Sequence, residues 1–134
     1  MGQLYELRFP VKEQDIVGLR DRVSRQLHDA GVGGDTAYAL VNVVDEICCN
    51  MMEYSEASWM KLEVDASDSK IHTLLQDNGV EFDPITAIQN TDPNQPATVT
   101  ERRLGLYMVG IMARDLLYRR EDGINCFSFT MKRN

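Results

Sequence analysis

The pattern of hydrophobic and polar positions predicts a strand and then a helix at the start of the chain. Residues 4–9, LYELRF, alternate apolar and polar side chains with a period of two, which is typical of a half-buried strand, and Pro10 ends it. Over residues 11–30 the apolar side chains recur at helical spacing, at Ile16, Leu19, Val23 and Leu27. This amphipathic helix is predicted to end at Gly31.

A second helix and a hairpin are predicted next. Asp35 and Thr36 can cap a helix that runs from about residue 37 to residue 54. The segments WMKLEVDA (59–66) and KIHTLLQD (70–77) have the composition of strands and are joined by SDS, which is typical of a turn. They therefore predict two strands that form a hairpin.

The remainder of the chain divides into a long loop, a helix and a second hairpin. The polar, proline-containing stretch from residue 86 to residue 103 shows no period and is longer than most connections in a compact domain, as functional lids or disordered loops are. Helical spacing resumes over residues 104–118. Residues 116–122 and 124–132, on either side of Gly123, predict a closing hairpin.

The order of these elements predicts an α+β fold. Two helices follow the first strand, and a hairpin, a loop, a helix and a second hairpin complete the chain. This order is typical of a two-layer α/β sandwich in which the helices cover one face of a mixed sheet. A chain of 134 residues lies in the range of one domain, so we expect a single domain over residues 1–134.

The composition narrows the classes of partner. The formal net charge is −7 and the pI is near 4.7, whereas nucleic-acid binding needs clustered Lys and Arg, so we expect no nucleic-acid partner. No apolar run reaches the roughly 18 residues that span a bilayer, and residues 1–13 lack an apolar signal core, so we expect a cytoplasmic protein without a membrane partner. The three cysteines match no disulfide or metal-site spacing and are predicted to be small buried side chains.

The second predicted helix carries a polar stripe among apolar neighbours. Asn42, Glu46 and Asn50 are spaced by four residues and therefore lie on one helix face. A solvated face would explain them. A carboxylate one turn from a carboxamide also suits a site where one side chain accepts a proton and the other binds a hard cation through oxygen. The helix alone leaves both interpretations open.

Two further segments carry candidate chemistry. In LLQDNGVEFDP an apolar strand runs directly into Asp77, Asn78 and Gly79, which is either a tight Asn-Gly turn or a place where the backbone approaches a flat ligand while the carboxylate accepts a hydrogen bond from it. In RRLGLYMVG, Gly105 stands at the start of a predicted helix, where free N–H groups and the helix dipole favour a phosphate.

In their order and spacing these three segments resemble the ATP-binding boxes of the GHKL (Bergerat-fold) ATPases, and most closely the anti-sigma-factor serine/threonine kinases. DEICCN matches that family's Glu-x-x-x-Asn box, DNGVEFDP its Asp-x-Gly box, and residues 104–132 its lid-end helix and closing hairpin. The resemblance covers about the whole chain. It implies the Bergerat-type sandwich, with an ATP lid at about residues 86–103.

The resemblance implies a role for each matching residue at the phosphate end of the site. Asn50 would ligate Mg²⁺ that bridges the phosphates, Glu46 would act as the base toward a serine hydroxyl, and Gly105 would lie under the phosphates. Arg102 and Arg103 replace two glycines that are usual at the lid end. They could clamp phosphate or stiffen the loop, and the sequence does not choose between these roles.

At the adenine end, the resemblance assigns Asp77 to the adenine amino group and lets Gly79 bring the backbone close to the base. Ser128, in the last strand, falls where the family often has a threonine near the adenine. Glu81 adds a negative charge after the Asp-x-Gly box.

The resemblance therefore predicts a kinase that binds ATP and Mg²⁺, phosphorylates a serine of an anti-sigma antagonist and sequesters a sigma factor. A homodimer is compatible with it, although no patch in the sequence can be assigned to one. Two alternatives stay open. The chain could be a degenerate module that binds a protein without catalysis, or the ATP-binding half of a split sensor kinase that works in trans.

Overall fold

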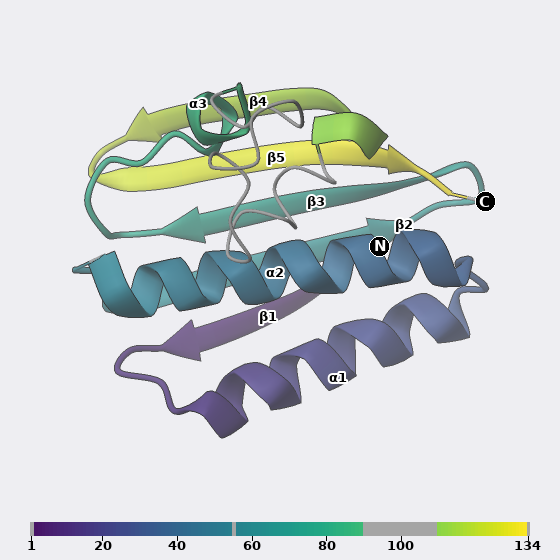
Figure 1. The fold of residues 1–134 in the computed structure, drawn as a ribbon, viewed down its shortest axis with the longest axis horizontal. Helices are drawn as coiled ribbons and strands as arrows, with labels where there is room; N and C mark the ends of the chain where they lie inside the picture. Colours follow the sequence, from purple (N-terminus) through teal and green to yellow (C-terminus); the bar gives the residue numbers. More distant parts are fainter. Residues whose placement is uncertain (1, 55, 90–109, 134) are drawn as a thin grey trace, which may run out of the picture.

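The protein is a two-layer sandwich of helices on one face of a five-stranded sheet (Figure 1). The computed structural model describes residues 2–54, 56–89 and 110–133, except for the side chains of residues 47, 49–54 and 87–89. The strands are β1 (Gln3–Arg8), β2 (Trp59–Ala66), β3 (Lys70–Asp77), β4 (Ala113–Glu121) and β5 (Ile124–Lys132). The helices are α1 (Glu13–Asp29), α2 (Gly34–Tyr54) and the short α3 (Pro84–Gln89).

The sheet has the strand order β1-β2-β3-β5-β4, and all its pairings are antiparallel. The prediction of an α+β sandwich with helices on one face is confirmed, but the prediction of a mixed sheet is wrong. Both α1 and α2 lie between β1 and β2 in the chain. Because two successive helices carry the chain along the sheet and back again, β2 enters antiparallel to β1 rather than parallel to it.

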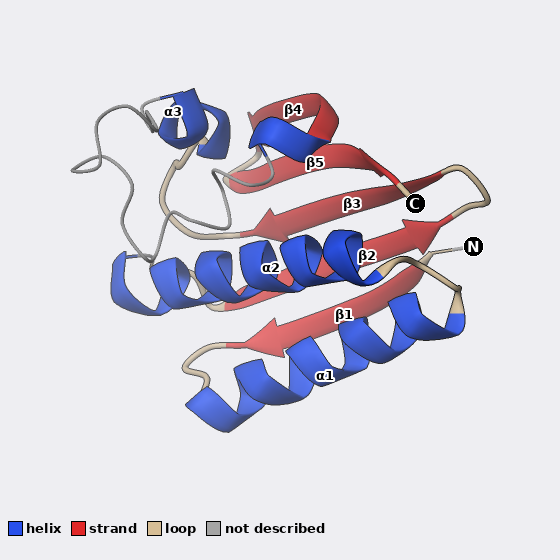
Figure 2. Ribbon diagram, turned by 45° about the vertical axis from the view of Figure 1, so that its right-hand side comes forward, coloured by secondary structure: helices blue, strands red, loops and turns tan. Residues whose placement is uncertain are grey.

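The period-two alternation of the strands assigns each side chain to one of two faces. Buried side chains such as Leu62, Leu75 and Phe127 are register partners across the sheet and face the helices. Their sequence neighbours face the other side, which carries no helix of the described chain (Figure 2). The helix-facing side therefore holds the core. It also holds any polar residue that lies an even number of positions from a buried residue of the same strand.

Helix α1 packs on the sheet through the four apolar residues that the sequence pattern selected, which are Ile16, Leu19, Val23 and Leu27. Each is at most 4% exposed. A polar contact ties the same helix to two strands: the Tyr5 hydroxyl donates to Gln26 Oε1 at 2.6 Å, and Gln26 Nε2 donates to the Val64 carbonyl at 2.8 Å. Because Gln26 uses both ends of its amide, it fixes the position of α1 over β1 and β2.

In the turn between α1 and α2, the predicted end of the first helix is confirmed, but the predicted start of the second helix is not. Gly31 has a φ of +77°, a conformation that glycine adopts without strain, and it ends α1 as expected. Helix α2 begins at Gly34, so Asp35 and Thr36 lie in its first turn instead of capping it. A carboxylate in the first turn is stabilised by the helix dipole, so acidic residues are common both at the N-cap and just after it. The sequence pattern therefore did not distinguish a capping role of Asp35 from a place in the first turn.

Two predictions for the C-terminal half are corrected. The stretch predicted as a loop from residue 86 begins inside α3, where Asp83 Oδ1 accepts the N–H of Ile85 at 2.9 Å. Six residues are too few to show a helical period. The predicted helix over residues 104–118 is wrong from Ala113 onward, because pairing with β5 makes this segment a strand. Residues 90–109 lie outside the described part of the chain.

The predicted closing hairpin is confirmed. Glu121 and Ile124 are register partners, so Asp122 and Gly123 form a two-residue turn with φ values of 52° and 76°. Positive φ at both positions is typical of a type I′ turn, for which Asp-Gly is a preferred sequence. This turn fixes the register of β5 from its first residues, and with it the face of Asn125.

Two further predictions concern membranes and cysteines. Among the described residues, no helix is both long and apolar enough to cross a membrane. Cys48 and Cys126 form no disulfide within the described part of the chain and are buried, as predicted, whereas the side chain of Cys49 lies outside that part.

A matched pair of valines on α1 tests how much the helix packing contributes to stability. Val23 is fully buried, whereas Val17 is 47% exposed on the same helix. We expect Val23→Ala to lower the free energy of unfolding by about 2 kcal/mol, since two buried methyl groups are lost and a cavity remains. Val17→Ala should change it by less than about 0.5 kcal/mol. Urea unfolding monitored by circular dichroism measures both values, and equal effects would contradict this packing.

Candidate functional site

The helix-facing side of the sheet carries a polar cluster at the end of β3. Asp77 is the last residue of β3, and its register partners are Met60 on β2 and Asn125 on β5. Met60 is buried, Asn125 is 5% exposed and Asp77 is half-buried. An acidic side chain therefore stands at the edge of the core, between an apolar and a polar neighbour.

One oxygen of Asp77 is used inside the protein. Asp77 Oδ1 accepts the backbone N–H of Gly79 at 2.8 Å and the side-chain Nδ2 of Asn125 at 3.1 Å. Among the residues that the structure describes, no donor contacts the other oxygen, Oδ2. The carboxylate is thus held in place by one oxygen while the other can accept a hydrogen bond from a ligand.

The Asn125 amide has a partner for each of its donor and acceptor positions. Its Nδ2 donates to Asp77 Oδ1 and to the Val80 carbonyl at 2.7 Å, and its Oδ1 accepts from the Tyr118 hydroxyl at 2.6 Å and from Arg120 at 2.9 Å. Arginine can only donate and a carbonyl can only accept, so these partners fix which end of the amide is oxygen. Asn125 therefore presents an N–H to Asp77 and has no freedom to turn.

Strand β4 supplies the donors that hold Asn125. Arg120 also donates to the Gly79 carbonyl at 3.0 Å, so one guanidinium nitrogen bridges the loop after β3 and the start of β5. Burial raises the pKa of Tyr118 above its usual value of 10, with Glu81 adding to this effect and Arg120 opposing it. The phenol therefore stays protonated at neutral pH and donates to the amide.

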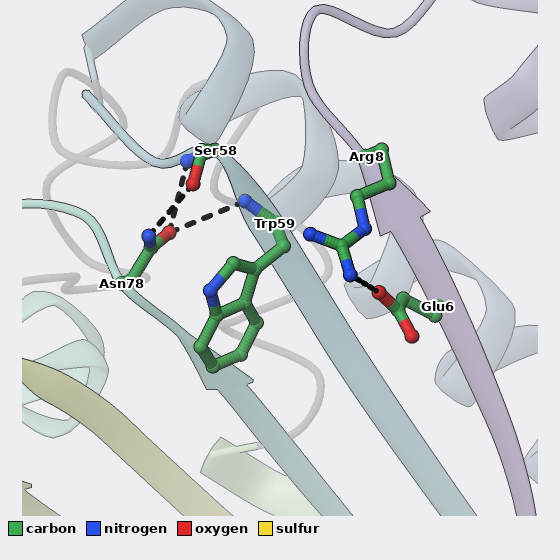
Figure 3. A network of polar contacts seen from close by, with 5 residues as sticks. All are labelled: Glu6, Arg8, Ser58, Trp59 and Asn78. Atoms are coloured by element: carbon green, nitrogen blue, oxygen red, sulfur yellow. Dashed lines mark hydrogen bonds and ion pairs between the residues drawn. The ribbon is translucent and has the colours of Figure 1, made fainter.

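The residue after Asp77 anchors the loop on its other side (Figure 3). Asn78 Oδ1 accepts the backbone N–H groups of Ser58 at 2.9 Å and Trp59 at 3.2 Å, and its Nδ2 donates to the Ser58 hydroxyl at 2.7 Å. The Asp-Asn-Gly segment is therefore tied to β2 through Asn78 and to β4 and β5 through Asp77 and Gly79. Of the two interpretations of this segment, a simple hairpin turn is excluded, since α3 follows it instead of a paired strand.

Helix α2 brings Glu46 to the same end of the molecule. The C-terminal ends of α2 and β3 lie together in both ribbon views (Figures 1 and 2). Cys48 Sγ lies 3.9 Å from Met60 Sδ, and Met60 is the register partner of Asp77, so the turn of α2 that holds Glu46 lies over this end of the sheet.

The polar stripe of α2 is divided by burial. Glu46 is only 5% exposed, whereas Asn42 and Asp45 are partly exposed, and Asp45 makes a 3.7 Å ion pair with Arg20 of α1. A solvated face explains Asn42 and Asp45 but not Glu46. Glu46 is therefore a buried carboxylate on the side of α2 that faces the sheet.

The structure describes only part of the predicted set of site residues. Asn50 lies on α2 one turn after Glu46, but its side chain is outside the described part. Arg102, Arg103 and Gly105 are outside the described residues altogether. Gly79 is buried beside Asp77.

Ser128 is separated from the predicted site. Its register partners are Leu74 and Leu117, and Leu117 is 57% exposed. Ser128 therefore points to the sheet face without helices, whereas Asp77 and Asn125 point to the opposite face. The residue of β5 that contacts Asp77 is Asn125.

Sequence reasoning missed Asn125, Tyr118 and Arg120. The period-two pattern of β5 places Asn125 on the same face as Phe127 and Phe129, and a polar residue on an otherwise apolar strand face was the available signal. Tyr118 and Arg120 gave no comparable signal, because a β-bulge between Arg114 and Leu117 shifts the parity of β4.

Comparisons with known proteins identify the family and a similar fold. Residues 9–131 match the family described as the histidine kinase-like ATPase domain. The fold is similar to that of a chain in the crystal structure of the SiaB–SiaC complex from Pseudomonas aeruginosa, with a TM-score of 0.61 and 12% identity over 96% of this chain and 89% of that one. The histidine kinase AdeS of Acinetobacter baumannii matches with a TM-score of 0.48 and 14% identity, over 98% of this chain and 68% of that one.

No curated protein sequence matches the chain. The family match extends from the end of β1 almost to the end of β5, so it includes the buried carboxylate of α2 and the Asp-x-Gly segment. The chain therefore belongs to the histidine kinase-like ATPase family, a family of ATP-binding domains.

Proposed function

We propose that the protein is an ATP- and Mg²⁺-dependent serine/threonine protein kinase of the anti-sigma type. It would phosphorylate a serine of a small anti-sigma antagonist and sequester a sigma factor. The observation that carries the proposal is the burial of Glu46 on α2, at the end of the sheet where Asp77 presents an oxygen without a described partner.

The adenine end of the proposed site consists of Asp77 and Gly79. Asp77 Oδ2 accepts a hydrogen bond from the exocyclic amino group of the base. The Gly79 N–H bonded to Asp77 Oδ1 and the contacts of Asn125 hold the carboxylate in one orientation before the nucleotide arrives. Preorganisation of this kind lowers the entropic cost of binding.

The transfer end consists of Glu46 and Asn50. Glu46 accepts the proton of the substrate serine hydroxyl, the serine oxygen bonds to the γ-phosphorus, and the bond from that phosphorus to the β–γ bridging oxygen breaks, which leaves ADP. Magnesium bound to the phosphates would neutralise part of their negative charge, with Asn50 as an oxygen ligand. Neutralisation matters here, since the protein itself carries a net charge of −7.

The proposed protein partner is supported by the fold and by the charge of the chain. The family contains ATP-binding domains, and one chain of the same fold has been solved in a complex of two proteins, SiaB and SiaC. The net charge of −7 favours a protein over a nucleic acid as the partner. A module that only binds a protein, or a split sensor kinase, would share the fold. These alternatives differ from the proposal in whether phosphate reaches a serine and whether Glu46 is needed.

Replacement of Asp77 tests the adenine end. In Asp77→Asn the amide can keep the turn to Gly79 through its oxygen, but it presents an N–H group to the amino group of the base. We expect ADP affinity to fall by about 10- to 100-fold. Isothermal titration calorimetry measures the loss, and an unchanged affinity would place the base elsewhere. Asp83→Asn, in the loop before α3, is the control and should bind ADP like the wild type.

Replacement of Asn50 tests the metal ligand. ATP that binds the native state raises the melting temperature by mass action, and Mg²⁺ should add to this shift. In Asn50→Ala the part of the shift that depends on Mg²⁺ should disappear. Asn42→Ala, two turns earlier on α2, should keep it. If Asn50→Ala and the wild type respond alike to ATP with Mg²⁺ in thermal unfolding, the proposed metal ligation by Asn50 is wrong.

Replacement of Glu46 tests the transfer step. In Glu46→Gln the side chain keeps its shape but loses the proton-accepting carboxylate, so phosphoryl transfer should fall by about 10²- to 10⁴-fold while ATP affinity stays within about threefold. Transfer is measured from γ-labelled ATP to proteins of the source cell's extract, with phosphoserine identified by mass spectrometry. Asp45→Asn, the neighbouring carboxylate, should leave the rate unchanged. Equal labelling by Glu46→Gln and the wild type would contradict the role of Glu46 as the base, and wild-type protein that labels no serine would favour the non-catalytic alternative.

A further inference from the structure

The contacts of Asp77 limit which base the site can recognise. Adenine offers a carboxylate one donor group, its exocyclic amino group. Guanine offers two adjacent donors, N1–H and the N2 amino group, which a carboxylate can accept together with its two oxygens. A free aspartate would therefore favour guanine by one additional charge-assisted hydrogen bond.

Asp77 is not free in this sense. Oδ1 has two lone pairs, and two donors already use them: the Gly79 N–H at 2.8 Å and Asn125 Nδ2 at 3.1 Å. The Gly79 bond forms within the loop and depends only on the local backbone. The Asn125 bond comes from a different strand and depends on the residue type at position 125.

Asn125 cannot turn away to release Oδ1. Its oxygen accepts from Tyr118 and Arg120, and its second N–H donates to the Val80 carbonyl. A rotation of the amide would place an N–H group against Arg120, which can only donate, and its oxygen against the Val80 carbonyl. At 5% exposure, solvent cannot compensate for these losses.

We propose that Asn125 determines base selectivity by occupying Asp77 Oδ1, so that the site recognises one donor of a base and excludes the two-donor edge of guanine. This inference rests on the proposed nucleotide site at Asp77 and adds a specificity-determining residue to it. Asn125 does not need to touch the nucleotide. It acts through Asp77 and is a positioning residue.

A comparison of IDP with GDP isolates the contribution of the second donor. Hypoxanthine, the base of IDP, carries N1–H like guanine but lacks the N2 amino group. When only Oδ2 is available, the second donor of guanine adds nothing. The wild type should therefore bind ADP most tightly and should bind IDP and GDP within about threefold of each other. This comparison needs no variant.

Asn125→Ser tests the role of the side chain. The serine hydroxyl is one bond shorter than the amide, so it leaves Oδ1 and opens the space beside it. GDP should then bind about tenfold or more tightly relative to IDP, and the preference for ADP over GDP should narrow by a similar factor. Asn125→Ala should show the same change, and it replaces the serine variant if that variant has no cooperative unfolding transition.

Asn78→Ala is the matched control. It removes a side-chain amide with three hydrogen bonds from the residue next to Asp77 but leaves the Asp77–Asn125 contact in place (Figure 3). A structural role alone would loosen the loop in both variants, whereas selectivity should change only in the Asn125 variants. A similar change of the GDP to IDP ratio in Asn78→Ala would overturn the inference.

Competition with a fluorescent ADP analogue, at fixed Mg²⁺, gives the dissociation constants of ADP, GDP and IDP for each protein. Tight ADP binding with a GDP to IDP ratio unchanged in the Asn125 variants would overturn the inference alone. Wild-type protein that binds GDP tenfold more tightly than IDP would also overturn it. Wild-type protein that binds none of the three would overturn the proposed nucleotide site and this inference together.

Discussion

The hydrogen bond between Asp77 and Asn125 is the constraint on which the candidate site depends. It joins the end of β3 to the start of β5 across the sheet, on the face that the helices cover. Tyr118 and Arg120 hold the amide from β4, and the Gly79 N–H holds the carboxylate from the loop. An acidic side chain at the edge of a core would otherwise sample several rotamers, and these contacts leave it one.

The second half of the candidate site is marked by the burial of Glu46. Glu46 is enclosed in the layer between α2 and the sheet, while the neighbouring Asp45 pairs with Arg20 near the surface. Such a division within one helix turn is costly for folding alone, because a carboxylate loses hydration when it is buried. Asp77 and Glu46 therefore belong to one proposed site, in which they contact opposite ends of the same nucleotide.

Much of the fold could be predicted from the sequence, because the signals were periodic and local. The apolar stripe of α1, and the strand composition of residues 59–66 and 70–77 on either side of a turn, identified these elements within one or two residues. The antiparallel sheet and the strand at Ala113 depended on pairings between distant segments, which a local pattern does not encode. In the candidate site, Glu46 was selected through its helical spacing and Asp77 through its place at a strand end, and their functional roles stay predictions. Asn125 was missed, since its role comes from a register across β3 and β5, and that register placed Ser128 on the opposite face.

A crystal structure of the protein with ADP and Mg²⁺ would show which oxygen of Asp77 the base contacts. We expect the adenine amino group to lie within hydrogen-bond distance of Asp77 Oδ2, with Oδ1 still bound to Gly79 and Asn125. A nucleotide bound away from Asp77, or a base that contacts Oδ1 after displacing Asn125, would contradict it.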